Sequence, residues 1–184
     1  KASFIHRLTN YFSFVISSAL LGIFLLRKAD YLMVESPPLF LGISGIWLSW
    51  IKHARLIFNV SDLWPESAVQ LGLVRKSSLA HRLSAWLERW CYSSAWLITG
   101  QSRGILSYIV ERFPQKTTYR LSNGVDLGKF GGHYLSDDLR QQLGDAGKCI
   151  AVYAGLHGLA QGLDQLIQAA DALRNEADLK IVLV

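Results

Sequence analysis

A pair of carboxylates follows an apolar run in the first third of this chain. Asp62 and Glu66 belong to the segment S-D-L-W-P-E at 61–66, directly after the apolar residues 55–60. A carboxylate in such a loop can accept a proton or orient a substrate hydroxyl, as general acid–base chemistry requires. The segment equally suits a helix start, where Asp62 would bind free backbone amides and Glu66 would complement the helix dipole. Both interpretations remain open at this point.

A second candidate site is rich in glycine. The segment Y-A-G-L-H-G-L-A-Q-G at 153–162 places Gly155, Gly158 and Gly162 between an apolar run and a helical pattern. Its spacing matches neither the dinucleotide-binding fingerprint nor the phosphate-binding P-loop. Glycines here would let a phosphorylated ligand approach backbone amides, or they would allow a helix to pack closely on a sheet. His157 could hydrogen-bond a ligand or serve a structural role.

A third motif, S-N-G-V-D at 122–126, lies between an apolar run and a polar stretch that contains glycines. Asn123 and Gly124 form a turn pair, because both residue types tolerate positive φ. A plain turn would explain the pair by itself. The position of the motif beside an expected domain boundary also makes it, with Asp126, a candidate interdomain segment.

The elements that must position these loops alternate between strands and helices. Strands are expected at 31–34, 55–60, 95–99, 117–121, 149–153 and 180–184, and helices at 39–52, from 79 onward, at 103–112 and at 159–174. Continuous apolar strands that alternate with helices predict an α/β fold with a parallel sheet covered on both faces. Ligands of such sheets bind beyond the carboxyl ends of the strands. The loops expected there are 35–38, 61–66, 100–103 and 154–162.

Charge is divided unevenly along the 184 residues. Residues 1–130 hold 15 Lys and Arg against 7 Asp and Glu, net +8, whereas residues 131–184 hold 4 against 7, net −3. A basic segment favours phosphates, an anionic membrane surface or nucleic acid as partners, and scattered charge that only keeps the surface soluble is the alternative. Nucleic acid is the weakest of the three, because the chain has no recognition helix, zinc finger or RNA-binding strand motif. A composition of 51% apolar residues excludes the disordered class.

Two cysteines, Cys91 and Cys149, are too few for a disulfide scaffold and lack metal-ligand spacing. They fit a reducing, cytosolic setting.

Two apolar stretches suggest contact with a membrane or a large core. Residues 11–26 are nearly free of charge between Arg7 and Arg27, and residues 39–51 precede Lys52. Both are shorter than the about 20 residues that a spanning helix needs. We therefore expect buried core helices or helices in the membrane interface, rather than spanning helices.

Together, the motifs resemble those of the retaining GT-B glycosyltransferases of glycosyltransferase family 4. The resemblance rests on S-N-G-V-D followed by Phe130, and on Y-A-G-L-H-G-L-A-Q-G-L-D with the helix after it. The runs F-N-V-S-D-L-W-P-E at 58–66 and I-T-G-Q-S-R-G at 98–104 are similar to a bacterial branch that builds lipid-linked surface polysaccharides, including fucosamine transferase-like members. The implied fold has two Rossmann-like parallel-sheet domains, both incomplete in this chain.

The resemblance also implies a domain plan and a reaction. Residues 1–130 would be an acceptor-side domain that lacks its first strand, 131–148 a linker, and 149–184 the start of the nucleotide-sugar domain. The implied reaction moves a sugar, with retention, from a UDP-linked donor to a polyprenyl-diphosphate-linked acceptor, without cofactor or metal. The enzyme would be cytoplasmic and peripherally attached to the inner membrane. The chain by itself is expected to be inactive, because it lacks parts of both halves of the cleft.

By the same resemblance, Asp62 and Glu66 would lie on the catalytic side and Asn123, Gly124 and Asp126 between the domains. The donor loop would use Gly155, His157, Gly158, Gln161 and Gly162. Many members carry Gly-Arg and Lys-Gly where this chain has Gly155-Leu156 and Gln161-Gly162, so the usual cationic contact to the diphosphate is absent.

Two other functions remain possible. A sugar-nucleotide 2-epimerase shares the fold and would form product without an acceptor. The other is a non-catalytic, membrane-associated binding module.

Overall fold

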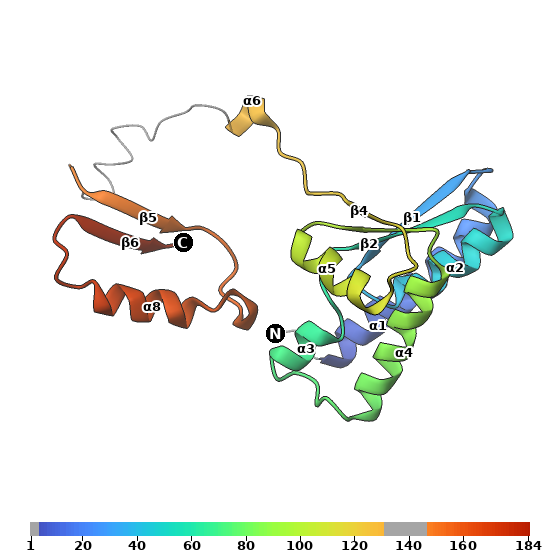
Figure 1. Ribbon diagram of the computed structural model, residues 1–184, viewed down its shortest axis with the longest axis horizontal. Helices are drawn as coiled ribbons and strands as arrows, with labels where there is room; N and C mark the ends of the chain where they lie inside the picture. The colour runs from blue at the N-terminus through green and yellow to red at the C-terminus, as the bar shows by residue number, and fades with distance from the viewer. Residues whose placement is uncertain (1–3, 131–146) are drawn as a thin grey trace. The chain divides into compact units, whose positions relative to one another are not determined.

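The computed structural model describes residues 4–130 and 147–184 and divides the chain into two compact units (Figure 1). Unit 1 is Lys1–Gly124 and unit 2 is Val125–Val184. Each unit contains one parallel sheet with helices, which confirms the predicted α/β class. The linker predicted at 131–148 lies outside the described residues, apart from its last two positions.

Four parallel strands form the sheet of unit 1, in the order β1-β2-β3-β4. They are β1 (Tyr31–Ser36), β2 (Arg55–Val60), β3 (Leu97–Gly100) and β4 (Thr118–Arg120). The bounds of β2 are those predicted. Strand β1 differs from the prediction at one end, and β3 and β4 differ at both ends, by one or two residues each. Each strand lies beside its successor in the chain, because a helix carries the chain back to the start of the next strand.

Three helices cover one face of this sheet: α2 (Leu41–Lys52), α4 (Leu79–Ser94) and α5 (Arg103–Arg112). A short helix, α3 (Glu66–Gln70), precedes α4. Close approach requires glycine on α2, because a Cβ on Gly45 would lie 2.4 Å from Val34 of β1 and one on Gly42 would lie 2.2 Å from Cys91 of α4. The core therefore sits between this helical layer and the sheet.

The other face of the sheet is open in the part of the chain that the structure describes. Tyr31 and Met33 of β1 and Tyr119 of β4 are exposed there. The prediction of a sheet covered on both faces is wrong for these residues. The reason is topological, since right-handed connections that always advance in one direction place every connecting helix on the same side.

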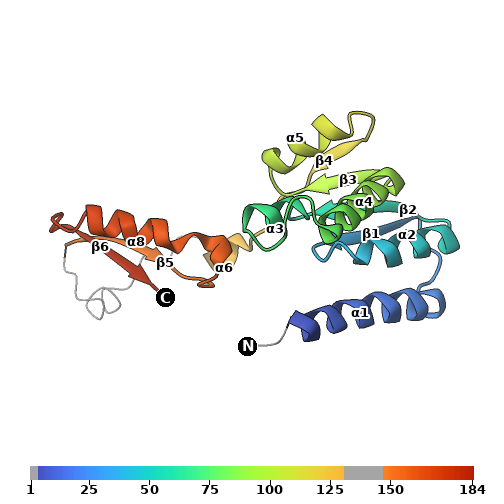
Figure 2. The same cartoon turned by 90° about the horizontal axis from the view of Figure 1, so that it is seen from below.

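Helix α1 (Phe4–Leu25) packs on α2 rather than on the sheet (Figure 2). Lys52 Nζ of α2 donates a hydrogen bond to the carbonyl of Ile23 over 2.6 Å, and the rings of Phe12 and Phe40 lie 5.1 Å apart. Among its described side chains only Val15 is buried. Of the two alternatives predicted for this stretch, the buried core helix is therefore wrong for α1. Within 4–130 and 147–184, no helix has both the length and the hydropathy that crossing a membrane requires.

Unit 2 is one βαβ unit. Strands β5 (Cys149–Tyr153) and β6 (Leu179–Leu183) pair in parallel, preceded by the short α6 (Leu127–Phe130). The sequence predicts one helix over 159–174, but the structure has a 3₁₀ turn, η1 (Leu159–Gln161), and then α8 (Leu163–Ala172). Gly162 separates the two, because its left-handed backbone, with φ of 59°, ends the first turn and begins α8.

Candidate functional site

A row of hydrogen-bonded polar side chains crosses the carboxyl ends of three strands in unit 1. Glu35, Asn59 and Thr99 share one register across β1, β2 and β3. Asn59 Nδ2 donates to Glu35 Oε2, and Thr99 Oγ1 donates to Asn59 Oδ1 over 2.6 Å. Because side chains alternate between faces along a strand, this row lies on the face opposite the helices.

Two loop residues extend the row. Ser61 Oγ donates to Glu35 Oε1, and Gln101 Nε2 donates to Ser61 Oγ over 2.6 Å. Both oxygens of the Glu35 carboxylate thus accept a hydrogen bond from the protein, of the charge-assisted kind that is stronger than a neutral one. We call this set the carboxylate network; its members are Glu35, Asn59, Ser61, Thr99 and Gln101.

The carboxylate network presents one fixed charge to solvent. Asn59 and Thr99 are buried, whereas Glu35 is exposed. An ionised carboxylate has about four acceptor positions, so Glu35 retains capacity after accepting from Asn59 and Ser61. Such a group can accept hydrogen bonds from the hydroxyls of a ligand without first being reoriented.

Asp62 follows Ser61 directly and has a local hydrogen-bond partner. Its Oδ1 accepts from Ser67 Oγ over 2.6 Å, and Ser67 Oγ also lies 2.6 Å from the carbonyl of Leu63. These bonds tie the loop to the start of α3. Glu66 is the first residue of α3, where a carboxylate complements the helix dipole. The N-cap role predicted for Asp62 is wrong, because its partner is a hydroxyl and no side chain caps α3, whereas Glu66 lies at a helix start as predicted. Asp62 is also exposed beside the carboxylate network.

Sequence reasoning did not select Asn59 or Thr99, and it placed Glu35, Ser61 and Gln101 only in candidate loops. One signal could have found the row. Glu35, Asn59 and Thr99 are each the next-to-last residue of an otherwise largely apolar strand. Aligning the strand ends would therefore have placed the three polar side chains next to one another.

The glycine loop of unit 2 follows β5. The amide of Gly155 donates to the carbonyl of Val184 over 3.2 Å, and the amide of Gly158 donates to Gln161 Oε1 over 3.1 Å. Both amides are therefore already used within the chain. The Gln161 side chain is exposed and can rotate away, so the Gly158 amide is the more accessible of the two to a ligand.

An aromatic contact stiffens the same loop. Tyr153 OH donates to the carbonyl of Leu156 over 2.9 Å, and the ring of His157 lies 6.1 Å from that of Tyr153. His157 is exposed, which leaves its ring nitrogens open to solvent.

The S-N-G-V-D motif contains the division between the two units, which falls after Gly124. Asn123 and Gly124 are exposed at the end of unit 1. Asp126 belongs to unit 2, where its Oδ1 accepts from the amide of Gly128 over 3.0 Å and so begins α6.

A buried ion pair joins α4 to α5 elsewhere in unit 1. Glu88 is 1% exposed, and its Oε2 lies 2.9 Å from a guanidinium nitrogen of Arg112. Burial raises the pKa of Glu88, although the hydrogen bond and charge of Arg112 oppose that rise. Burial likewise raises the pKa of Cys91 to about 12, so its thiol is inert. In the described part of the chain, no cluster of three or more His, Cys, Asp or Glu could hold a metal ion.

Comparisons with known proteins bear on the family and the fold of the chain. Residues 3–124 match the family described as Glycosyl transferase 4-like domain. Among solved structures, the chain is similar to Anabaena Alr3699/HepE in complex with UDP and glucose, with 16% identity and a TM-score of 0.55 over 92% of this chain. That likeness confirms the predicted GT-B class of α/β fold. The chain spans about half of that relative, 51% of its length, and no curated protein matches.

Proposed function

Because the chain belongs to the family of glycosyl transferase 4-like domains, we propose that it is part of a retaining glycosyltransferase. The match over residues 3–124 is the observation that carries the proposal. The proposed donor is a UDP-linked sugar, a choice supported by the UDP and glucose bound to HepE. In the proposed reaction the bond from the anomeric carbon to the diphosphate breaks, and a bond to an acceptor oxygen forms on the same face of the sugar.

The carboxylate network is the proposed acceptor side of this reaction. Asp62 orients the attacking hydroxyl of the acceptor. The departing diphosphate takes the proton of that hydroxyl. Glu35, held by Asn59 and Ser61, accepts a hydrogen bond from a neighbouring hydroxyl of the acceptor. Preorganised groups of this kind lower the barrier because they need no rearrangement during the reaction.

The glycine loop is the proposed donor side. The amides of Gly155 and Gly158 approach the diphosphate, with Gln161 turning away from Gly158 as the donor binds. His157 and Gly162 belong to the same loop. Backbone dipoles then stabilise the charge that develops on the departing diphosphate.

The proposed acceptor is a polyprenyl-diphosphate-linked glycan, used in the synthesis of cell-surface polysaccharide. The basic character of residues 1–130, net +8, supports a reaction at an anionic membrane surface. The proposed location is therefore cytoplasmic, with peripheral attachment to the inner membrane.

The test uses the full protein with a panel of UDP-sugars and a polyprenyl-diphosphate-linked acceptor. We expect UDP release that depends on the acceptor, together with a glycolipid whose new bond keeps the anomeric configuration of the donor, measured by NMR. Conversion of the donor to an epimer without acceptor would instead identify a 2-epimerase. A product with inverted anomeric configuration would overturn retention. If no donor is consumed, the protein is a non-catalytic binding module instead.

A further inference from the structure

The helices of unit 1 form an apolar groove on their outer side, away from the sheet. One hollow of about 240 Å³ is lined by Trp47 and Trp50 of α2 and by Trp90 of α4. A second, of about 400 Å³, is lined by Leu83 and Trp86 of α4. Ile43 lines both hollows, so they form one surface. We call these residues the tryptophan groove; its members are Ile43, Trp47, Trp50, Leu83, Trp86 and Trp90.

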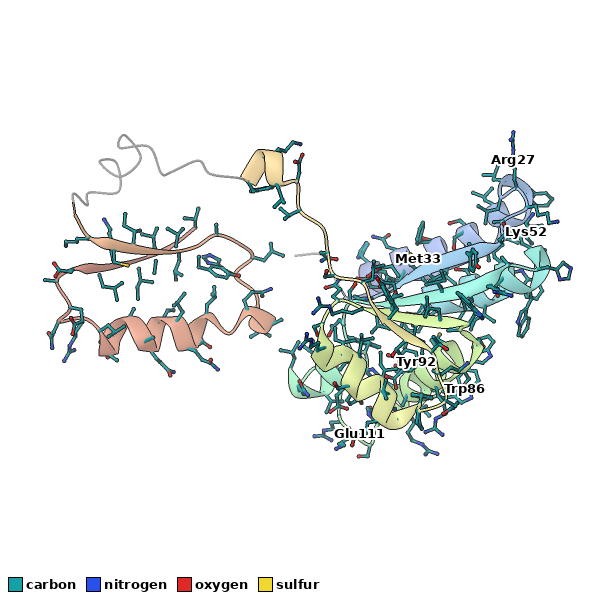
Figure 3. The ribbon with its side chains drawn as sticks, turned by 45° about the horizontal axis from the view of Figure 1, so that its top comes forward. Arg27, Met33, Lys52, Trp86, Tyr92 and Glu111 are labelled. Atoms are coloured by element: carbon teal, nitrogen blue, oxygen red, sulfur yellow. The ribbon has the colours of Figure 1, made fainter. Side chains whose placement is uncertain are left out.

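The side chains of the tryptophan groove are exposed to solvent, unlike those of the core. Trp50 is 61% and Trp86 is 62% exposed, whereas Tyr92, also on α4, lies in the core (Figure 3). Trp86 and Trp90 stack with their ring centroids 5.7 Å apart, which holds them as one flat apolar face. A contiguous exposed patch of large apolar side chains marks an interaction surface.

The exposed charges on the described parts of α1, α2 and α4, the helices around the groove, are of one sign. The segments of α1, α2 and α4 contain a single acidic residue, Glu88, which is buried against Arg112. Arg82 and Arg89 are exposed on α4, at helical spacings of four and three residues from Trp86. The outer surface of these helices is thus complementary to an anionic partner. A second copy of the same surface would bring cations together, which disfavours self-association through the groove.

We propose that the tryptophan groove docks on an anionic lipid bilayer, with its indole rings at headgroup depth and Arg82 and Arg89 on the lipid phosphates. Tryptophan favours this interfacial layer because the ring is apolar while its N–H can still hydrogen-bond. The inference rests on the membrane location given under the proposed function and assigns its surface. It does not depend on sugar transfer.

The test measures binding of the full protein to vesicles of phosphatidylcholine, with and without phosphatidylglycerol, by cosedimentation. The vesicles contain no polyprenyl lipid and no donor. We expect binding to the anionic vesicles alone, weakened by salt. The triple variant Trp47→Ser, Trp50→Ser, Trp86→Ser should lose at least tenfold in partition. The pair Arg82→Gln, Arg89→Gln should lose about 25-fold at low salt, since each cation near such a surface contributes about fivefold.

Trp96→Ser is the matched control. Trp96 is 46% exposed but packs against Tyr31 and Arg55, away from the groove. Its loss should leave partition unchanged, and circular dichroism verifies that every variant is folded. Equal binding by the groove variants and the unaltered protein would overturn the proposal, as would absence of binding to anionic vesicles.

A shift in oligomeric state of the groove variants, seen by sedimentation, would identify a second copy as the occupant and would also overturn the proposal. Transfer to an acceptor in detergent separates the two hypotheses. If vesicle binding fails while transfer persists, the groove assignment is wrong. If binding persists and transfer is absent, the proposed reaction is wrong.

Discussion

The side-chain amide of Asn59 donates a hydrogen bond to the carboxylate of Glu35, so that a buried residue fixes an exposed charge. Thr99 Oγ1 donates to Asn59 Oδ1 over 2.6 Å, which sets the orientation of the amide. A ligand hydroxyl would therefore meet a carboxylate that is already in place. Because of this preorganisation, Glu35 is a stronger candidate for binding a ligand hydroxyl than its place in a predicted loop indicated.

Glu35→Gln should lower kcat/KM for the acceptor about 10- to 100-fold in the full protein. The change keeps the size of the side chain but removes its charge, and a hydrogen bond to a charged group contributes about 1.5–3 kcal/mol. The KM for the nucleotide-sugar should stay the same. Steady-state kinetics with each substrate varied in turn measure both effects, and an unchanged acceptor parameter would remove Glu35 from the site.

Asp62→Asn should reduce turnover, whereas Ser67→Ala should not. Ser67 ties Asp62 to α3, so both substitutions disturb the same hydrogen bond, but only the first removes the carboxylate. Comparing kcat and urea stability of the two variants separates catalysis from loop structure. If both variants lose the same small stability and keep full turnover, Asp62 has only the structural role.

Gly42→Ala and Gly45→Ala should each destabilise unit 1 by about 1–3 kcal/mol, the usual cost of overpacking a core. A Cβ would lie 2.2 Å from Cys91 at Gly42 and 2.4 Å from Val34 at Gly45, so neighbours must move. Urea denaturation followed by circular dichroism measures the change.

The control for this pair is Gly104→Ala in α5. The nearest atom to a Cβ there is 3.8 Å away, on Ser102, so no neighbour must move. Alanine should stabilise α5 by about 0.5–1 kcal/mol through helix propensity. Equal destabilisation at all three glycines would contradict the close packing of α2 between sheet and α4.

Local elements could be predicted where the chain carries its own boundary signals. Ser102 accepts a hydrogen bond from the amide of Ile105 and caps α5, whose bounds Arg103–Arg112 are those predicted. The polar residue Ser61 likewise follows β2 directly, and the strand ends at Val60 as predicted. Such signals act within a few residues, so sequence alone can reveal them.

Arrangement in space could not be predicted in the same way. A run free of charge fits a core helix and a surface helix equally, and only the packing of α1 on α2 shows that Val15 alone is buried among its described side chains. The pairing of Glu35 with Asn59 depends on strand order and register, which no local pattern specifies. The sequence likewise does not show that helices cover only one face of the sheet, because that depends on the direction in which successive strands are added.

Gln161→Lys should lower the KM for the nucleotide-sugar several-fold. The substitution releases the Gly158 amide, which now donates to Gln161 Oε1, and it adds a cation where the diphosphate is proposed to bind. Rising salt should weaken the gain, because screening acts on exposed charges. Gln161→Ala is the matched control, since it releases the amide without adding charge. No difference between the two variants would place the diphosphate elsewhere.

The buried pair of Glu88 and Arg112 should make the stability of unit 1 depend on pH. Burial raises the pKa of Glu88 above its ordinary value of 4.5, so the folded state binds this proton more tightly than the unfolded state does. Stability therefore falls as pH rises from about 4.5 through the raised pKa, and ionised Glu88 remains a cost above it. In Glu88→Gln this part of the pH dependence should vanish, which urea denaturation between pH about 4.5 and 7.5 measures.

Arg112→Gln should instead make the stability of unit 1 depend more strongly on pH. It leaves Glu88 buried without its cation, so the pKa of Glu88 rises further and the loss of stability is larger at neutral pH than near pH 4.5. We expect about 2–3 kcal/mol at neutral pH, below the 3–5 kcal/mol of a fully buried pair, because Arg112 is about a third exposed. Arg174→Gln, which breaks the exposed pair with Asp171, should change stability by less than about 0.5 kcal/mol. An Arg112 cost that is the same at both pH values would contradict a buried Glu88 whose charged form Arg112 stabilises.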